Sequence, residues 1–448
     1  MIVSFLSRYS TVSPTNKVEC DNSNIFLIKS IERMFFDIVS PILEGFNHLL
    51  SYTFTLKRNE NLSIAVLCNI IGHGNTYDEW STSFIIALSK IKYIVKIHVI
   101  TPPQNRKIIK MYSLPKKCIV HEILDYDHPL SMIKAVDLIS ELKCDLVISV
   151  SGPTAFGRGL IANFIGLLLP LIIQRNTESE VKVINQGSSY THDIKLLGYS
   201  GIINSIKLFV AKAVEKFIFK RVKTYFQLSY YCKVIENKLG RNYVGGLIVS
   251  DYIDALATLY MNSSDTSVVI ERHLEKDKIN ILLHGFWGPQ KNPEVALRAV
   301  ENLKIRNPTI KLTVSGGINN HFPGYKEYFQ SLLKKYEGVI DKYLGYVEEK
   351  DLLQLFIDNE IILMPYRASG GQSGVLEMAS FFENIVVCTD FPEFREEMKN
   401  DLVIFTALDD FEQSILKALE MEKKIPSTIS IQNKIQCIIN NIGIFLTE

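Results

Sequence analysis

The sequence of 448 residues lacks the patterns that mark several large classes of protein. Its seven cysteines are scattered, with neither a CxxC pair nor the spacing of a metal site, so we expect reduced cysteines in a cytosolic protein. The net charge of +1 gives no field that would favour nucleic acid. No apolar run reaches ~20 residues, and the first residues lack a basic start and a long apolar core. We therefore expect neither a membrane span nor a signal peptide.

The first 60 residues differ in pattern from the rest of the chain. Between Ile28 and Leu49, apolar residues recur at every third or fourth position, with charged residues between them. This spacing predicts an amphipathic helical extension over residues 1–60. Because the polar face carries both signs of charge, packing on the body of the protein is favoured over attachment to a membrane surface. Peripheral attachment to the inner face of the membrane stays open as the second interpretation.

Residues 61–265 alternate buried-type strands with segments of helical spacing. Strands are predicted at four apolar runs, which are Leu62–Cys68, Ile94–Ile100, Leu146–Val150 and Val181–Ile184. Alternation of this kind is typical of a parallel α/β domain, in which ligands bind beyond the carboxyl ends of the strands. Gly72 and Gly74 follow the first of these strands, and His192 follows the last. All three are candidate ligand-binding residues, although a loop glycine or a lone histidine is also common in purely structural roles.

Three other segments of this half bear on its organisation. Leu160–Ile173 is almost wholly apolar but too short to span a bilayer, which predicts a buried helix and leaves a membrane-dipping face as the alternative. The chain from Lys207 to Tyr243 is predicted to be helical and is rich in Lys and Arg. The polar stretch Asn262–Ser267 is predicted to link two domains.

The α/β pattern restarts over residues 275–425. Strands are predicted at Ile279–Leu283, Ile310–Ser315, Ile361–Met364 and Ile385–Thr389. Helices are predicted between them, at Pro293–Leu303, Tyr325–Tyr336 and Glu349–Ile357, with a last one at Ile429–Leu446. Lys291 lies in the loop after the first of these strands and could reach a ligand at the same sheet edge. The alternative is a solvated loop lysine.

The most informative stretch lies near residue 370. A small, glycine-rich loop, Ser369–Gly374, precedes a helix predicted over Val375–Phe382. Unpaired N–H groups and the positive end of the helix dipole favour an anion there, and Ser373 adds a hydroxyl donor. Glu377 should point back toward the loop, where a pair of sugar hydroxyls suits it better than a phosphate. The pattern indicates a nucleoside diphosphate with its ribose on Glu377, and the alternative is an ordinary βα turn.

Over roughly residues 279–396 the sequence resembles the nucleotide-sugar-binding domain of the retaining GT-B-fold glycosyltransferases called family 4. The resemblance rests on the stretches HGFWGPQKNPEVALRAV, YLGYVEEKDLLQLFIDNEIILMPYRAS and SGGQSGVLEMA. It is looser over residues 61–260 and does not cover residues 1–60. It implies a GT-B fold, in which two Rossmann-like, doubly wound α/β domains face a cleft. It also implies that residues 426–448 form a helix that returns to the N-terminal acceptor domain.

The resemblance implies roles for single residues. Lys291 matches the lysine that contacts the donor diphosphate, and Glu377 matches the second Glu of the family's paired-Glu motif. Gly374 and Val375 fall where backbone N–H groups meet the donor, with Ser373 beside them. Gly285 matches the glycine after the strand, and Tyr346 lies in the segment that leads to the nucleotide. The acceptor-side residues would be Gly72, Gly74 and His192.

The sequence departs from the family at three places. Ser369 stands where the first Glu of the pair is expected, which leaves any role at the transferred sugar open. Phe286 replaces the usual arginine after the strand glycine, and Arg367 is a candidate replacement for the missing cation. Pro392-Glu393 replaces a glycine pair. We interpret these departures as divergence in the handling of the donor rather than as loss of activity.

The resemblance implies a hexosyltransferase (EC 2.4) that moves a sugar from a nucleotide-diphosphate sugar to a glycan or lipid-linked acceptor with retention of configuration. It implies no metal and no other cofactor, a place in polysaccharide biosynthesis and a cytoplasmic location, peripheral to the membrane in the second interpretation above. Two alternatives stay open. Nucleotide-sugar 2-epimerases share the two-domain arrangement, and a non-catalytic scaffold that binds sugar nucleotides would tolerate Ser369 and Phe286.

Overall fold

The computed structural model describes most of the chain beyond residue 60. The described residues are 61–69, 78–103, 114–152, 155–156, 160–191, 202–240, 245–248, 253, 255–256, 259, 277–319, 322, 324–369, 371–397, 401–422 and 428–447. The predicted helical extension over residues 1–60, the linker Asn262–Ser267 and the candidate residues Gly72, Gly74 and His192 lie outside them.

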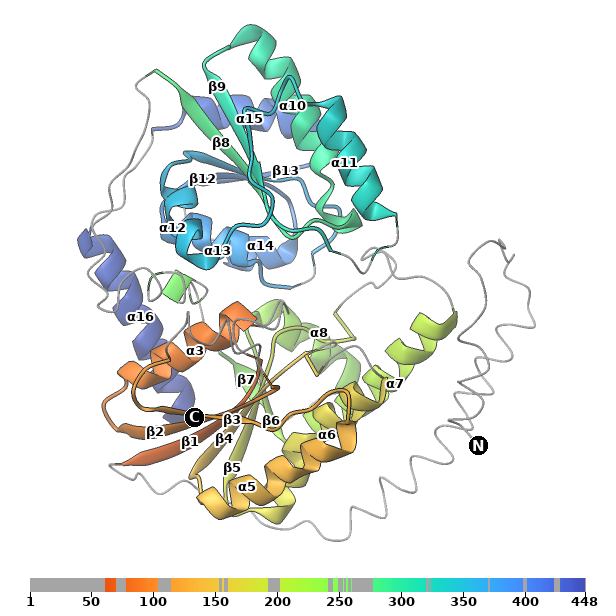
Figure 1. Ribbon diagram of the computed structural model, residues 1–448, viewed down its shortest axis with the longest axis vertical. Coiled ribbons are helices and arrows are strands. Elements are labelled where there is room, and N and C mark those ends of the chain that lie inside the picture. The colour runs from red at the N-terminus through yellow and green to blue at the C-terminus, as the bar shows by residue number, and fades with distance from the viewer. Residues whose placement is uncertain are drawn as a thin grey trace. The chain divides into compact units, whose positions relative to one another are not determined.

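The first half of the described chain forms a parallel sheet. Its strands run in the order β3-β2-β1-β4-β5-β6-β7. They are β1 (Leu62–Leu67), β2 (Ile94–Thr101), β3 (Cys118–Glu122), β4 (Leu146–Ser151), β5 (Glu180–Asn185), β6 (Lys223–Phe226) and β7 (Gly245–Leu247). Helices cover both faces of this sheet (Figure 1), as an all-parallel sheet requires. The helices of this half are α3 (Asp78–Lys90), η2 (Pro129–Ile133), α5 (Lys134–Leu142), α6 (Leu160–Asn176), α7 (Ile202–Phe219) and α8 (Ser229–Leu239).

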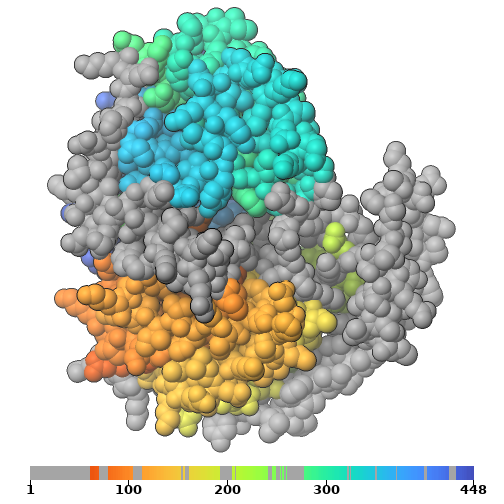
Figure 2. All heavy atoms as spheres, in the orientation of Figure 1, coloured from red at the N-terminus to blue at the C-terminus, as the bar shows by residue number. Residues whose placement is uncertain are grey.

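The second half repeats the same plan. Its parallel sheet has the order β10-β9-β8-β11-β12-β13. The strands are β8 (Ile279–His284), β9 (Ile310–Ser315), β10 (Lys342–Tyr343), β11 (Ile361–Met364), β12 (Ile385–Thr389) and β13 (Val403–Thr406). The helices are η3 (Pro289–Lys291), α10 (Pro293–Arg306), α11 (Tyr325–Lys335), α12 (Glu349–Ile357), α13 (Gly374–Phe381), α14 (Pro392–Glu397), η4 (Leu408–Asp410), α15 (Phe411–Glu420) and α16 (Thr428–Thr447). Figure 2 shows the atoms of this half as spheres, coloured from green through cyan to blue along the chain.

Both sheets follow the doubly wound order: the next two strands are added on one side of the first strand, and the later strands are added on its other side. The order of the strands therefore reverses beside the first strand. In the second sheet this reversal falls between β8 and β11, which pair directly through Ile281 with Ile361 and Leu282 with Ile362. The loops after these two strands therefore leave the sheet side by side. This topology brings the loop of Lys291 to the glycine-rich loop before α13, although the two loops are far apart in the sequence.

The predicted strands agree with the structure to within a residue or two, and β11 and β12 have the predicted bounds. One prediction is wrong: the segment from Lys207 to Tyr243 is not helical throughout, because β6 separates α7 from α8. The strand has only four residues, and its last three are buried. A run this short between two helices gives too little periodicity to separate it from its neighbours.

The last helix, α16, contacts elements of both halves. Near its end, the buried ammonium of Lys182 on β5 donates hydrogen bonds to the carbonyl oxygens of Phe445 and Leu446, at 2.9 and 3.1 Å. Near its start, Lys434 donates to the carbonyl oxygen of Phe381 at the end of α13, at 2.7 Å. The last helix is thus hydrogen-bonded to β5 of the first half and to α13 of the second. Figure 1 shows α16, in blue, beside α3.

The apolar helix α6 packs as part of the interior. Most of its large apolar side chains are buried or half-buried, and Ile161 is the one that is largely exposed in the described part of the helix. The packing therefore favours the buried-helix interpretation of Leu160–Ile173. Among the helices that the structure describes, we find none with the length and apolar character needed to cross a membrane.

Candidate functional site

The loops after β8 and β11 are joined by their backbones. The N–H of Arg367, just beyond β11, donates to the carbonyl oxygen of Gln290 at 2.8 Å. Asn292 adopts a left-handed conformation with φ of 45°, and Pro293 then begins α10. This turn fixes the position of Lys291 at the end of η3, close to the residues that follow β11.

Lys291 lies against an aromatic ring in a poorly hydrated environment. Its Nζ atom is 3.6 Å from the centre of the Tyr366 ring. Burial lowers the pKa of Lys291 to about 7, and the nearby carboxylate of Glu397 opposes this shift. Burial, and then the charge of Lys291, lower the pKa of His284 to about 4, so this histidine is neutral at pH 7. A second anion beside Lys291 would stabilise the charged form of this lysine further.

Gly285 lies beside both Lys291 and Tyr366. A Cβ atom at this position would lie 3.9 Å from the Tyr366 hydroxyl and 4.0 Å from Cδ of Lys291. Both are ordinary contact distances, so the absence of a side chain leaves room beside the ammonium. Gly316 packs directly on the backbone of Gly285, with φ of +118° and no room for a Cβ atom. Gly285 thus lies between the space beside the Lys291 ammonium on one side and Gly316 on the other.

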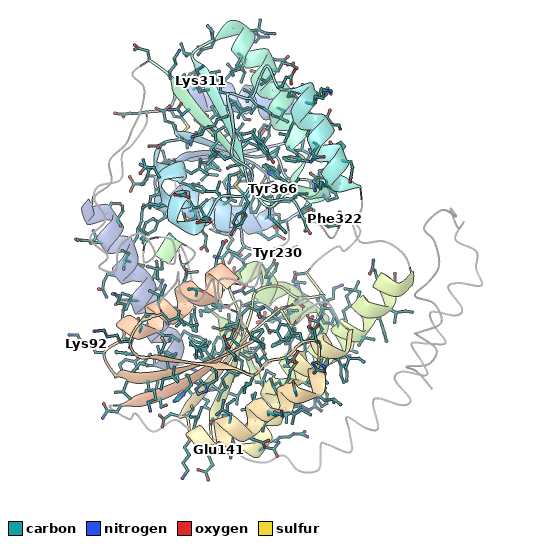
Figure 3. The ribbon with its side chains drawn as sticks, viewed as in Figure 1. Lys92, Glu141, Tyr230, Lys311, Phe322 and Tyr366 are labelled. Carbon is teal, nitrogen blue, oxygen red and sulfur yellow. The ribbon has the colours of Figure 1, made fainter. Side chains whose placement is uncertain are left out.

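The N-terminus of α13 completes this space. Ser373 is the N-cap residue, and its N–H lies 3.2 Å from each carboxylate oxygen of Glu397. The N–H groups of Gly374 and Val375 belong to the first turn and have no acceptor within the helix. Figure 3 shows Tyr366 among the elements of this second sheet. Lys291, Gly285 and Ser373 therefore converge around Tyr366. The carboxylate of Glu397 lies at the N-terminus of α13.

Glu377 is fully buried and is turned toward the loop, as the lean of helical side chains predicts. The side-chain amide of Gln372 donates to its Oε1 atom. A neutral N–H donor at this carboxylate shows that it accepts hydrogen bonds from the loop side. Sugar hydroxyls are donors of the same kind.

Two exposed aromatic side chains flank Gly317. Tyr346 is 68% exposed and Phe286 is 42% exposed. A Cβ atom at Gly317 would lie 3.5 Å from a ring atom of each. The two rings provide flat apolar surface just beyond the strand glycine.

Ser369 and Arg367 do not join this cluster through the contacts found among the described residues. The Ser369 hydroxyl donates to the carbonyl oxygen of Gly371 at 3.1 Å, within the loop itself. Arg367 is exposed, and its charge acts on Tyr325 and Tyr328 of α11, where it partly offsets the raised pKa of each. In the part of the chain that the structure describes, no group of three or more His, Cys, Asp or Glu is placed to hold a metal ion.

Two members of the site, Tyr366 and Glu397, are not among the residues predicted from the sequence. Burial raises the pKa of the Tyr366 hydroxyl well above its usual value. Tyr366 could have been found, because it directly follows the strand end and Pro365. Glu397 lies on a separate short helix, and nothing in its local sequence indicates that it reaches Ser373.

Comparison with known proteins gives structural likeness only. No protein-family model and no curated protein matches the chain. HepE of Anabaena, in a structure with UDP, is 13% identical, with 86% of this chain and 100% of that chain covered and a TM-score of 0.57. Sucrose-phosphate synthase from Thermosynechococcus elongatus is 10% identical, with 86% and 94% covered and a TM-score of 0.58. The putative UDP-N-acetylglucosamine 2-epimerase from Listeria monocytogenes is 10% identical, with 81% of this chain and 88% of that chain covered and a TM-score of 0.53.

These likenesses extend over both sheets and agree with the doubly wound order of each. They confirm the fold class expected from the sequence, which is the GT-B fold of two Rossmann-like domains.

Proposed function

We propose that this protein transfers a hexosyl group from a nucleotide-diphosphate sugar to a glycan or lipid-linked acceptor, with retention of configuration, in polysaccharide biosynthesis. One observation carries the proposal. The Lys291 ammonium, the side of Gly285 that bears no side chain and the N-terminus of α13 lie around the Tyr366 side chain. A cation beside unpaired backbone N–H groups suits a diphosphate. The glycosyltransferases among the structural neighbours, and the UDP and UDP-glucose bound by HepE, support this choice.

The proposed reaction breaks the bond between C1 of the sugar and the diphosphate oxygen, and the electron pair stays on that oxygen. Lys291, the Ser373 hydroxyl and the N–H groups of Gly374 and Val375 stabilise the negative charge as it develops. The acceptor hydroxyl attacks C1 from the same face, and its proton passes to the leaving phosphate. Since the positive charge needed at the diphosphate comes from Lys291, we propose that transfer requires no metal ion.

The rest of the donor extends from this space in two directions. We propose that the ribose hydroxyls bind Glu377 and that the base lies near Tyr346, whose ring is exposed. Ribose would then displace the side-chain amide of Gln372 from the carboxylate. The acceptor side, with Gly72, Gly74 and His192, remains a proposal from the sequence.

Two other functions would use the same donor site. The likeness to a 2-epimerase favours conversion of a nucleotide sugar without an acceptor, and Ser369 and Phe286 favour a non-catalytic scaffold. Incubation with a panel of nucleotide sugars, with and without glycan acceptors and with EDTA present, separates the three. Nucleotide release that requires an acceptor supports transfer. Sugar conversion without an acceptor supports epimerisation, and binding without turnover supports a scaffold.

Replacing Glu377 by glutamine should weaken nucleotide binding more than it slows the chemical step. The carboxylate accepts hydrogen bonds from the ribose, which is remote from the bond that breaks. A hydrogen bond to a charged group contributes roughly 1.5–3 kcal/mol, so affinity should fall about 10-fold or more. Calorimetric titration with nucleoside diphosphate measures the change. Unchanged affinity in a folded variant would show that the ribose lies elsewhere.

As the second interpretation of residues 1–60, we propose peripheral attachment to the inner face of the membrane. The buried side chains of α6 leave this role to residues 1–60 rather than to Leu160–Ile173. A lipid-linked acceptor would then lie at the same surface. Co-sedimentation with liposomes of anionic and neutral composition, with a chain lacking residues 1–60 as the control, tests this. We expect the full chain to pellet and the shortened chain to stay in solution. A full chain that stays in the supernatant with every lipid contradicts the proposal.

A further inference from the structure

The short helix α14 places two adjacent carboxylates at the N-termini of two other helices. Glu396 accepts hydrogen bonds from the N–H groups of Ser229 and, at 2.8 Å, of Tyr230, where α8 of the first half begins. Glu397 accepts from the N–H of Ser373, the N-cap residue of α13 in the second half, with 3.2 Å to each oxygen. Figure 3 labels Tyr230 at this end of α8. One helix of the second half thus holds the end of a helix in each half.

The contact at α8 supplies a cap that this helix lacks in its own sequence. Its N-cap residue is Leu228, whose side chain makes no hydrogen bond and has no acceptor atom. The first N–H groups of a helix have no acceptor within it, and the helix dipole favours a negative charge there. The Glu396 carboxylate meets both needs with charge-assisted hydrogen bonds. This cap is present only while the two halves keep the arrangement that brings α14 to α8.

The contact at α13 lies in the proposed donor site. The Glu397 carboxylate stands at the helix end where we propose that the diphosphate binds, and its charge opposes the effect of burial on the pKa of Lys291. A diphosphate brings further negative charge to the same helix end and the same ammonium. Like charges this close repel each other, most of all where water is scarce. The donor and Glu397 therefore compete, and Glu397 must give way when the donor binds.

Glu397 is not placed to withdraw by itself. It is 7% exposed, so its side chain has little free space into which it could turn. The helix that carries it has only six residues, and Glu396 directly precedes Glu397. The same helix packs on the donor site through Phe394, whose buried ring lies 5.8 Å from the Tyr366 ring, edge to face. A ligand that displaces Glu397 therefore acts on Glu396 through α14.

We propose that α14 couples the donor site to the contact between the two halves. An anion bound at α13 displaces Glu397, α14 shifts, and Glu396 releases the N-terminus of α8. The inference rests on the proposed donor site and adds to it a way in which the bound nucleotide controls how the two halves are joined. Linkage is reciprocal, so releasing α8 by other means must tighten nucleotide binding by the same factor.

Hydrogen–deuterium exchange of the full chain, with and without UDP as the probe, reports on the cap directly. Peptides that begin before Phe226 retain the label at the amides of Ser229 and Tyr230, the two N–H groups that Glu396 accepts. We expect UDP to speed exchange at these amides about 5-fold or more, the lower end of common coupling factors. The nucleotide would bind in the second half, so this change in the first half reports the coupling.

The substitution Glu396→Gln removes the charge of the cap without touching the proposed donor site. Glu327→Gln makes the same change at an exposed position of α11 and is the matched control. Calorimetric titration should show UDP binding about 5-fold or more tighter to Glu396→Gln than to the wild type and the control. In Glu396→Gln the α8 amides should already exchange fast and respond no further to UDP. The exchange experiment on the wild type needs no substitution, so it tests the coupling even if this variant fails to fold.

Unchanged or slower exchange at the α8 amides when UDP binds would overturn the coupling. Equal or weaker UDP binding by a folded Glu396→Gln protein would overturn it as well. In both cases, normal UDP binding by the wild type leaves the proposed donor site standing. A wild type that binds neither UDP nor another nucleoside diphosphate contradicts the donor site and the coupling together.

Discussion

Replacing Lys291 by alanine is expected to abolish most turnover and to leave the fold intact. The ammonium lies beside the space lined by Gly285 and the start of α13, where the diphosphate charge would develop. Loss of a charge-assisted contact of this kind raises the barrier by roughly 1.5–3 kcal/mol or more. That corresponds to about a 10- to 100-fold fall in kcat/KM. Steady-state kinetics with the nucleotide sugar found in the panel measures the change.

The control is Lys335→Ala, which removes an exposed lysine of α11 paired with Glu294. Exposed pairs contribute little, so this variant should behave as wild type. Near-normal kcat/KM in a well-folded Lys291→Ala protein would exclude Lys291 from the mechanism.

The same lysine should make donor binding depend on pH. Because the pKa of Lys291 is lowered to about 7 before the donor binds, the ammonium loses its proton as the pH rises above that value. Donor affinity should therefore be greatest below pH 7 and fall as the pH rises further. The Lys291→Ala protein should lack this dependence, and titration with the donor across this range measures it. The diphosphate of a nucleotide sugar does not titrate in this range, so the donor itself adds no slope.

Deleting α16 is expected to have the largest effect on stability. Its apolar residues on one face are buried, among them Ile431, Ile435, Ile438, Ile442 and Phe445. Full burial of such a side chain contributes about 1.5–3 kcal/mol, so their sum approaches the whole stability of a domain, about 5–15 kcal/mol. A chain that ends at Ser427 should unfold at a much lower temperature and lose turnover, although no residue of the proposed donor site is removed.

A single substitution gives the same test in a chain that still folds. Lys182→Met removes the ammonium that bonds the last turn of α16 and keeps a long apolar side chain. We expect a lower melting temperature and unchanged affinity for UDP, because Lys182 is on β5 and the proposed donor site is on the second sheet. Calorimetry and UDP titration measure both. A truncated protein with wild-type stability and activity would contradict the role that we assign to α16.

The sequence predicts the four inner strands of the second sheet but not its edge strands β10 and β13, and it predicts the detail of the site only in part. Strands β11 and β12 are apolar on both faces and stand between clear breaks, so their bounds can be read directly. Lys291 and Ser373 follow strands that the doubly wound order makes neighbours, and their convergence could therefore be predicted. Glu397 could not, because its position depends on how α14 packs against the start of α13.

The most direct test of the proposed donor site is a crystal structure of the full chain with bound UDP. We expect the diphosphate within hydrogen-bond distance of Lys291 Nζ and of the N–H groups of Gly374 or Val375, with ribose on Glu377. A diphosphate bound elsewhere, or a chain that binds no UDP and no other nucleoside diphosphate, would contradict this site.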